Sequence, residues 1–135
     1  MLQPKKQKFR KQFRGKMRGK AQRGSTVAFG KFGIKATTCG WLSAKQIESA
    51  RKTIQHYLKR AGKLWIRVFP DKPVTKKGPG VKMGAGKGDI HEYVAVIRPG
   101  RILFELDGVS EADAREAFRK AAHKISMITT FVTRE

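Results

Sequence analysis

The chain has 135 residues, enough for one domain with its own core, and its 31 lysines and arginines against 10 aspartates and glutamates give a net charge of +21. Such self-repulsion destabilises a compact chain unless a polyanion neutralises it, so we expect a nucleic acid partner, with a membrane surface as the rival polyanion. The single cysteine, Cys39, excludes an internal disulfide and a thiolate zinc site and favours a reducing compartment, and no apolar run approaches the roughly 18 residues that span a bilayer.

The positive charge is unevenly distributed along the chain. Residues 1–47 contain 13 basic and no acidic residues, residues 48–90 contain 11 and three, and residues 91–135 contain seven of each. The excess therefore falls on the N-terminal arm, the first predicted helix and a central loop. This pattern predicts one binding side and one solvent-facing side.

Residues 1–25 are expected to form a basic extended arm. Between Lys5 and Arg23 a basic residue recurs every two or three positions, with too little apolar surface to fold alone, so we expect the segment to order on RNA. A solubilising tail and a mitochondrial presequence are the alternatives, although proline and several glycines interrupt the amphipathic helix that a presequence needs. Phe9 and Phe13 are expected either to stack on bases or to dock on the domain.

Two short strands, at 26–30 and 33–37, are predicted to precede a helix that runs from Ser43 to Gly62. Ser43 with Gln46 three residues later has the pattern of a capping box, and Gly62 is a typical C-terminal stop. One face of the helix is apolar. The opposite face carries lysines spaced by seven residues, for which phosphate contact is the favoured role: Lys45, Lys52 and Lys59.

Residues 63–70 alternate as a strand, and a long loop is predicted between Asp71 and Asp89. The loop contains Pro73, Pro79, five glycines and five lysines. A loop of this length without structure of its own is uncommon in a compact domain. It is therefore expected to be disordered or to be ordered by what it binds.

The next two segments, 92–97 and 101–106, alternate on either side of a turn and predict an antiparallel hairpin. A second helix is predicted to begin after Ser110, and a last strand at 128–133 closes the chain. These elements make residues 26–135 a single α+β domain with a largely antiparallel sheet and two helices. The outer face of the second helix, with Lys120 and Lys124, is expected to face water or a protein neighbour.

No catalytic or cofactor site is expected. The glycine-lysine run 84–88 fails as a phosphate-binding loop because Gly88 stands where a Ser or Thr is required and a strand pattern follows. His56, His91 and His123 have no metal-ligand spacing. The glycines of the run are instead expected to let the backbone approach an RNA backbone closely.

Several segments together resemble the bacterial and plastid form of large-subunit ribosomal protein sixteen. They are the start Met1-Leu-Gln-Pro-Lys-Lys, Phe29-Gly-Lys-Phe-Gly33, Arg60-Ala-Gly-Lys-Leu-Trp-Ile-Arg-Val-Phe-Pro-Asp-Lys-Pro73, Met83-Gly-Ala-Gly-Lys-Gly88 and Thr129-Thr-Phe-Val-Thr133. The resemblance runs nearly end to end. It departs at Lys82, where relatives commonly have an arginine, so that a bidentate contact becomes a point charge.

The resemblance implies an α/β hammerhead fold and a non-catalytic constituent of the large ribosomal subunit. Its implied partners are the 23S rRNA near the peptidyl-transferase centre, the A-site tRNA with the P-site tRNA as a second candidate, and neighbouring large-subunit proteins, in the cytoplasm or the plastid stroma. The implied role is to position tRNA and complete subunit assembly. The residues expected to contact RNA are Lys5, Lys6, Lys8, Arg10, Lys11, Arg14, Lys16, Arg18, Lys20, Arg23, Lys45, Lys52, Lys59, Arg60, Lys76, Lys77, Lys82, Met83 and Lys87.

Two other functions are compatible with the sequence. A free-standing nucleic-acid chaperone would share the high charge, but it would be found away from ribosomes. A nucleotide-dependent enzyme would require the glycine-lysine run to hold a triphosphate.

Overall fold

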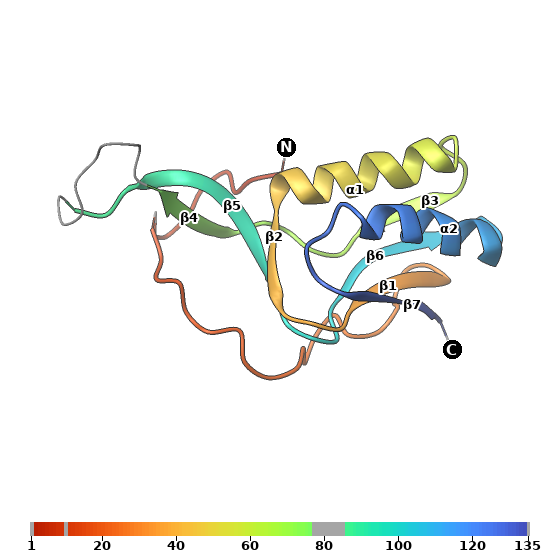
Figure 1. The fold of residues 1–135 in the computed structure, drawn as a ribbon, viewed down its shortest axis with the longest axis horizontal. Helices are drawn as coiled ribbons and strands as arrows, with labels where there is room; N and C mark the ends of the chain where they lie inside the picture. The colour runs from red at the N-terminus through yellow and green to blue at the C-terminus, as the bar shows by residue number, and fades with distance from the viewer. Residues whose placement is uncertain (1, 10, 77–85, 135) are drawn as a thin grey trace.

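The computed structural model describes residues 2–9, 11–76 and 86–134, and within them the chain forms two helices and two antiparallel sheets (Figure 1). The predicted α+β class is confirmed. In chain order the elements are β1 (Phe32–Ala36), β2 (Gly40–Ser43), α1 (Ala44–Tyr57), β3 (Lys63–Ile66), β4 (Lys72–Lys76), β5 (Asp89–Ile97), β6 (Ile102–Asp107), α2 (Glu111–Ala122) and β7 (Thr129–Thr133).

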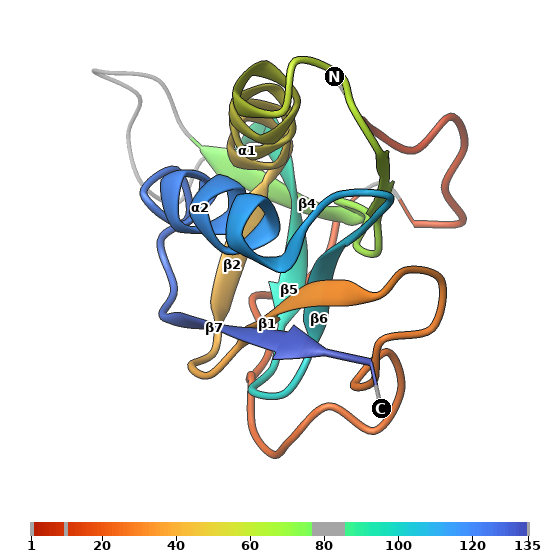
Figure 2. The ribbon, with the colours of Figure 1, turned by 90° about the vertical axis from the view of Figure 1, so that its right-hand side faces the viewer.

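The two sheets have different roles in the architecture. The four-stranded sheet, in the order β3-β6-β1-β7, lies beneath the two helices (Figure 2). In the three-stranded sheet, in the order β2-β5-β4, strands β2 and β5 contact α1, while β4 and the adjoining part of β5 extend away from the helices as a curved projection (Figure 1). The chain therefore consists of a packed body and an outlying β4–β5 hairpin.

The predicted hairpin between 92–97 and 101–106 is wrong. The first segment belongs to β5 and the second to β6, and these strands lie in different sheets. β5 is already paired on both edges by β2 and β4, and β6 by β3 and β1, so neither strand has a free edge for the other. Between them Gly100, at φ 99°, donates its N–H to the Ala36 carbonyl at 2.7 Å and turns the chain into the second sheet.

Helix α1 begins as predicted and ends earlier than predicted. Ser43 and Gln46 form both hydrogen bonds of the capping box, at 3.2 Å to the Ser43 hydroxyl and 3.0 Å to the Gln46 side chain. The helix ends at Tyr57, not at Gly62. The chain leaves it through Lys59 and Arg60, both with positive φ.

The helices pack against each other and cover the body's core. Ile47, Ile54 and Leu42 are fully buried, as are Phe104 of β6 and, nearly so, Phe118 of α2. Ser110 caps α2 as predicted, its hydroxyl accepting the Asp113 N–H at 3.2 Å. Neither described helix has the length and apolar content needed to cross a lipid bilayer.

Three strand predictions need correction. Residues 26–30 form no strand, because the N–H groups of residues 28–30 bond to the side chain of Glu105 and not to another strand. The strand predicted at 63–70 ends at Ile66, before Pro70, which has no N–H to donate. The segment predicted as a loop from Asp71 to Asp89 contributes strands at both of its ends.

Candidate nucleic-acid interface

The β4–β5 hairpin is the first half of the candidate interface. Lys72 pairs with Val94 and Lys76 with Asp89, so the two strands are antiparallel. β4 is an edge strand, which explains how it accommodates Pro73 without losing a ladder hydrogen bond to a second neighbour. The hairpin carries Lys76 and Lys87, both exposed, outward from the body.

The N-terminal arm is the second half, and it runs beside this hairpin. Lys87 donates from Nζ to the Gln12 carbonyl at 2.8 Å, and Lys11 donates from Nζ to the Lys87 carbonyl at 3.3 Å. Nearer the N-terminus, the Gln7 side chain donates to the Asp71 carbonyl at 2.9 Å. Residues more than sixty positions apart in the sequence are thus brought into one surface.

Trp41 of β2 holds the two halves together. The Lys72 ammonium lies 5.4 Å and the Arg14 guanidinium 5.7 Å from the indole ring, within cation–π range. Lys72 also donates to the Arg14 carbonyl. A matching contact lies further along the arm, where the Lys87 ammonium lies 5.2 Å from the exposed Phe13 ring. Phe13 therefore contacts the hairpin, one of the two roles predicted for it.

The contact between the arm and the hairpin brings positive charges together, which is electrostatically unfavourable for the chain alone. Burial lowers the pKa of the Lys72 ammonium, and the positive charges of Arg14 and Lys87 lower this pKa further. Among the described side chains, none of the four ion pairs includes a residue of the arm or the hairpin. A polyanion bound at this surface would relieve the repulsion.

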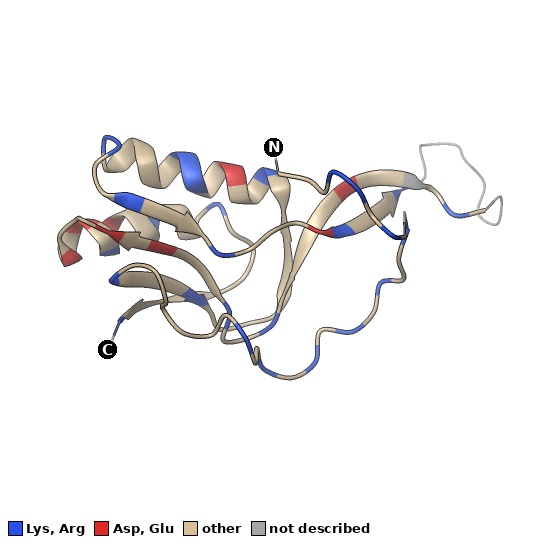
Figure 3. Ribbon diagram, turned by 180° about the vertical axis from the view of Figure 1, so that it is seen from behind, with Lys and Arg blue, Asp and Glu red and all other residues tan. Residues whose placement is uncertain are grey.

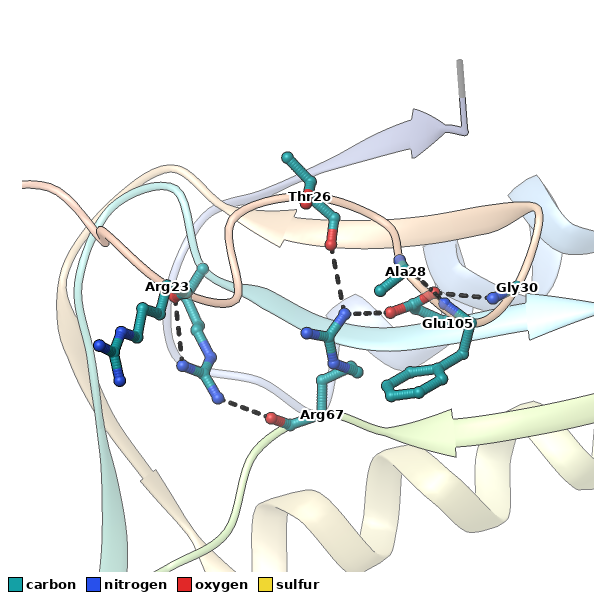
Figure 4. Close-up of polar contacts among 8 residues, drawn as sticks. Arg23, Thr26, Ala28, Gly30, Arg67 and Glu105 are labelled. Atoms are coloured by element: carbon teal, nitrogen blue, oxygen red, sulfur yellow. Dashed lines mark hydrogen bonds and ion pairs between the residues drawn. The ribbon is translucent and has the colours of Figure 1, made fainter.

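Sequence reasoning missed the anchor at the base of the arm (Figure 4). The fully buried Glu105 carboxylate accepts the N–H groups of Phe29 and Gly30 at 2.8 Å each and of Ala28 at 3.1 Å, and it forms an ion pair with Arg67. Arg101 donates to the Arg67 carbonyl at 2.7 Å and to the Arg23 carbonyl at 3.4 Å. The chain therefore leaves the body in a direction fixed by hydrogen bonds to the buried Glu105 carboxylate and from Arg101.

Burial alone would raise the pKa of the Glu105 carboxyl. The hydrogen bonds from Gly30, Arg67, Phe29 and Ala28 outweigh that effect, and the pKa lies below the ordinary value of 4.5. Glu105 is therefore a carboxylate at neutral pH. No pattern in the sequence distinguishes it from a surface glutamate, since it sits in an alternating strand where an acid is usually solvent-facing.

The predicted RNA-contacting residues are placed as follows. Figure 3 shows lysine and arginine spread along the arm, while acidic residues occur mainly on the body and near the base of the hairpin. Lys11 is half-buried, and the exposed residues are Lys5, Lys6, Lys8, Arg14, Lys16, Arg18, Lys20, Arg23, Lys45, Lys52, Lys59, Arg60, Lys76 and Lys87. Arg10, Lys77, Lys82 and Met83 lie outside the described residues.

The described histidines, cysteine and carboxylates form no group of three or more that could hold a metal ion. The feature that stands out is a cationic arm and hairpin in a chain whose C-terminal third, residues 91–135, carries no net charge. This arrangement is that of a basic nucleic-acid-binding protein.

A family model described as Ribosomal protein L16p/L10e matches residues 4–132. The chain belongs to this family and is a structural constituent of the large ribosomal subunit. The resemblance inferred from the sequence is thereby confirmed. The match includes nearly all of the arm as well as the body.

Proposed function

We propose that the chain binds 23S rRNA near the peptidyl-transferase centre, helps to position the A-site tRNA and completes assembly of the large subunit. In this proposal residues 1–25 act as an RNA-binding arm and residues 26–135 as the single domain that carries it. The observation that supports the proposal most directly is the joint surface of arm and hairpin, where Arg14, Lys72 and Lys87 meet and, among the described side chains, no acid is ion-paired with them.

Phosphate contacts supply most of the affinity in this proposal. Lysine interacts with phosphate as a point charge and does not distinguish bases. The protein therefore recognises mainly the shape of the folded RNA. With about 6 to 10 phosphate contacts, affinity falls on the order of 10³ to 10⁵ between about 50 and 200 mM salt. The exposed Phe9 ring adds a surface on which a base can stack.

The test uses large subunits stripped of this protein by high salt and rebuilt with variants. Lys76→Gln with Lys87→Gln is expected to weaken rebinding and reduce its salt dependence, because each lost phosphate contact lowers the slope by about 1. The matched control is Arg115→Gln with Arg119→Gln. It removes the same charge from α2, where both arginines are already paired with glutamates. Equal slopes for wild type and hairpin variant would refute the rRNA contact.

The tRNA part is tested on the same rebuilt subunits. Lys82→Gln with Lys87→Gln is expected to weaken A-site tRNA binding, measured with labelled tRNA at saturating occupancy of the ribosomal protein. The α2 control is expected to leave tRNA binding unchanged. If tRNA binds equally well to both, the positioning role is wrong even where rRNA binding is retained.

A further inference from the structure

A groove between the two helices is lined by lysines that the sequence pattern places on opposite sides of the molecule. This interhelical groove has a volume of about 710 Å³ and is lined by Lys52, His56, Tyr57 and Lys59 of α1 and its end, and by Lys120 and Lys124 of α2 and its end. Lys52 and Lys59 were expected to contact RNA, whereas Lys120 and Lys124 were expected to face water or protein. The structure places all four lysines around one depression.

Among the residues that the structure describes, none of those lining the groove is acidic, and none of the groove's lysines takes part in an ion pair. The other cations of α2 differ, since Arg115 pairs with Glu111 and Arg119 pairs with Glu116. The two arginines of α2 are therefore ion-paired within the helix, whereas Lys120 and Lys124, which follows the end of the helix, form no ion pair among the described side chains.

Tyr57 forms the aromatic part of the groove, between the lysines. The Lys120 ammonium lies 4.8 Å from the centre of its half-buried ring, which fixes the lysine over the groove. On the other side of the Lys52, His56 and Lys59 ridge lies a second hollow of about 640 Å³. Arg60 lines that second hollow, so cations face both sides of the ridge.

The backbone at the end of α1 places Lys59 and Arg60 in an unfavourable conformation. Lys59 and Arg60 have φ values of 52° and 64°, in the left-handed region that residues with a Cβ rarely adopt. The Arg60 N–H bonds to the Gln55 carbonyl at 2.9 Å and holds this turn. Favourable interaction with helix dipoles explains cations at the ends of helices. It does not explain Lys52, which lies in the interior of α1.

We propose that the interhelical groove binds the phosphates of an rRNA segment separate from the one held by the arm and hairpin. The protein then bridges two segments of rRNA. This inference rests on the proposed rRNA partner and adds a second site to it. The C-terminal helix is in this account part of an RNA-binding surface.

RNA fits the groove better than a protein neighbour does. Protein interfaces have an apolar, aromatic core that is depleted in lysine. The large exposed apolar side chains of the described chain are Phe9, Phe13, Phe29, Phe69, Val96 and Ile128, and none of them lines the groove. Unpaired ammonium groups are suited to phosphates, whose contacts require charge and little shape.

The experiment compares Lys120→Gln/Lys124→Gln with Arg115→Gln/Arg119→Gln in rebinding to salt-stripped large subunits. Both variants remove two cations from α2 or the residues just after it, and each removes one cation–π contact, that of Lys120 with Tyr57 or that of Arg115 with Phe131. The groove variant is expected to lower the slope of log affinity against log salt by about 2, and the arginine variant by much less. Thermal denaturation of the free proteins checks that both remain folded.

A second measurement identifies the occupant as RNA. Iron tethered to the thiol of Lys124→Cys, in a Cys39→Ser background, is expected to cleave an rRNA strand in rebuilt subunits. Equal slopes for the lysine and arginine variants, or the absence of rRNA cleavage, would overturn the groove as an RNA site. Failure of the proposed function is distinguishable, because it shows as an unchanged slope in the Lys76→Gln/Lys87→Gln variant.

Discussion

The Glu105 carboxylate of β6 and the Arg67 guanidinium form an ion pair beneath the backbone of residues 28–30. Glu105 is fully buried, and the Arg67 side chain is only 16% exposed. Arg67 also donates to the Thr26 carbonyl at 3.2 Å, so the pair holds the segment that joins the arm to β1 from two directions. A buried carboxylate of the body thus helps to fix where the cationic arm begins.

Glu105→Gln is expected to destabilise the protein by about 3 to 5 kcal/mol, because it leaves Arg67 as a partly buried cation without its counter-charge. The amide nitrogen also presents N–H groups toward a site that contains only donors. Urea denaturation at pH 7 measures the change as a lower midpoint with an unchanged m-value. The arm is expected to become more accessible to trypsin at the same time.

The control is Glu111→Gln on α2. Glu111 pairs with Arg115, but both side chains are more than half exposed, and such surface pairs contribute about 0 to 1 kcal/mol. A loss in Glu105→Gln no larger than in this control would show that the buried pair does not stabilise the arm's origin.

The stability of the protein is expected to depend on pH through Glu105. Its folded-state pKa lies below the ordinary 4.5, so its contribution is fully present above that value and is lost as pH falls through the folded-state pKa. The difference in unfolding free energy between wild type and Glu105→Gln should therefore be largest near pH 7 and shrink below pH 4.5. Glu48 and Glu116, whose pKa values are also lowered, are present in both proteins and cancel. A difference independent of pH would contradict the assignment.

Trp41→Leu is expected to release the arm from the hairpin. The substitution removes the cation–π contacts to Arg14 and Lys72, together worth about 1 to 2 kcal/mol, which corresponds to a roughly 5- to 30-fold larger population of the undocked arm. Hydrogen exchange of the amides near Arg14 measures this population. The control is Trp65→Leu, since Trp65 stacks on Phe29 and contacts Lys63, away from this part of the arm. Faster exchange in the control alone would refute the docking role of Trp41.

Local signals in the sequence predicted the local features. The Ser43 and Ser110 caps are where the pattern placed them, because a cap depends on residues within one turn of the helix. The strands β2 and β4 were missed. β2 is only four residues long, and β4 is rich in lysine and contains a proline, so neither has a strand's typical composition.

The pairing of strands that lie far apart in the chain could not be predicted from the sequence. The alternation at 92–97 and 101–106 is the same whether the strands pair with each other or with other strands, and only the complete fold shows that both have their edges occupied. The buried and exposed faces of α1 and α2 could be predicted from the sequence only for each helix separately. Their relative placement, which brings Lys120 toward Lys59, depends on how the helices pack.

Gly62 is expected to tolerate no side chain, for a reason separate from its backbone conformation. Its φ is 75°, and a Cβ there would lie 2.6 Å from the Asp107 carbonyl oxygen and 2.7 Å from a methyl group of Val109. The close approach joins the start of β3 to the end of β6, where Lys63 pairs with Asp107. Gly62→Ala therefore has to push the two strands apart.

Gly19 provides the matched control, because its φ of 79° is nearly the same but no atom lies within 4 Å of a Cβ built on it. An alanine that keeps the left-handed backbone conformation lowers the unfolding free energy by about 1 to 2 kcal/mol at either position. Gly62→Ala incurs a further 1 to 3 kcal/mol, roughly, from overpacking. Urea denaturation is expected to show a clear loss for Gly62→Ala and little change for Gly19→Ala, since the arm can shift without disturbing the core. Equal losses would mean that backbone conformation alone, and not the contact between β3 and β6, requires glycine at position 62.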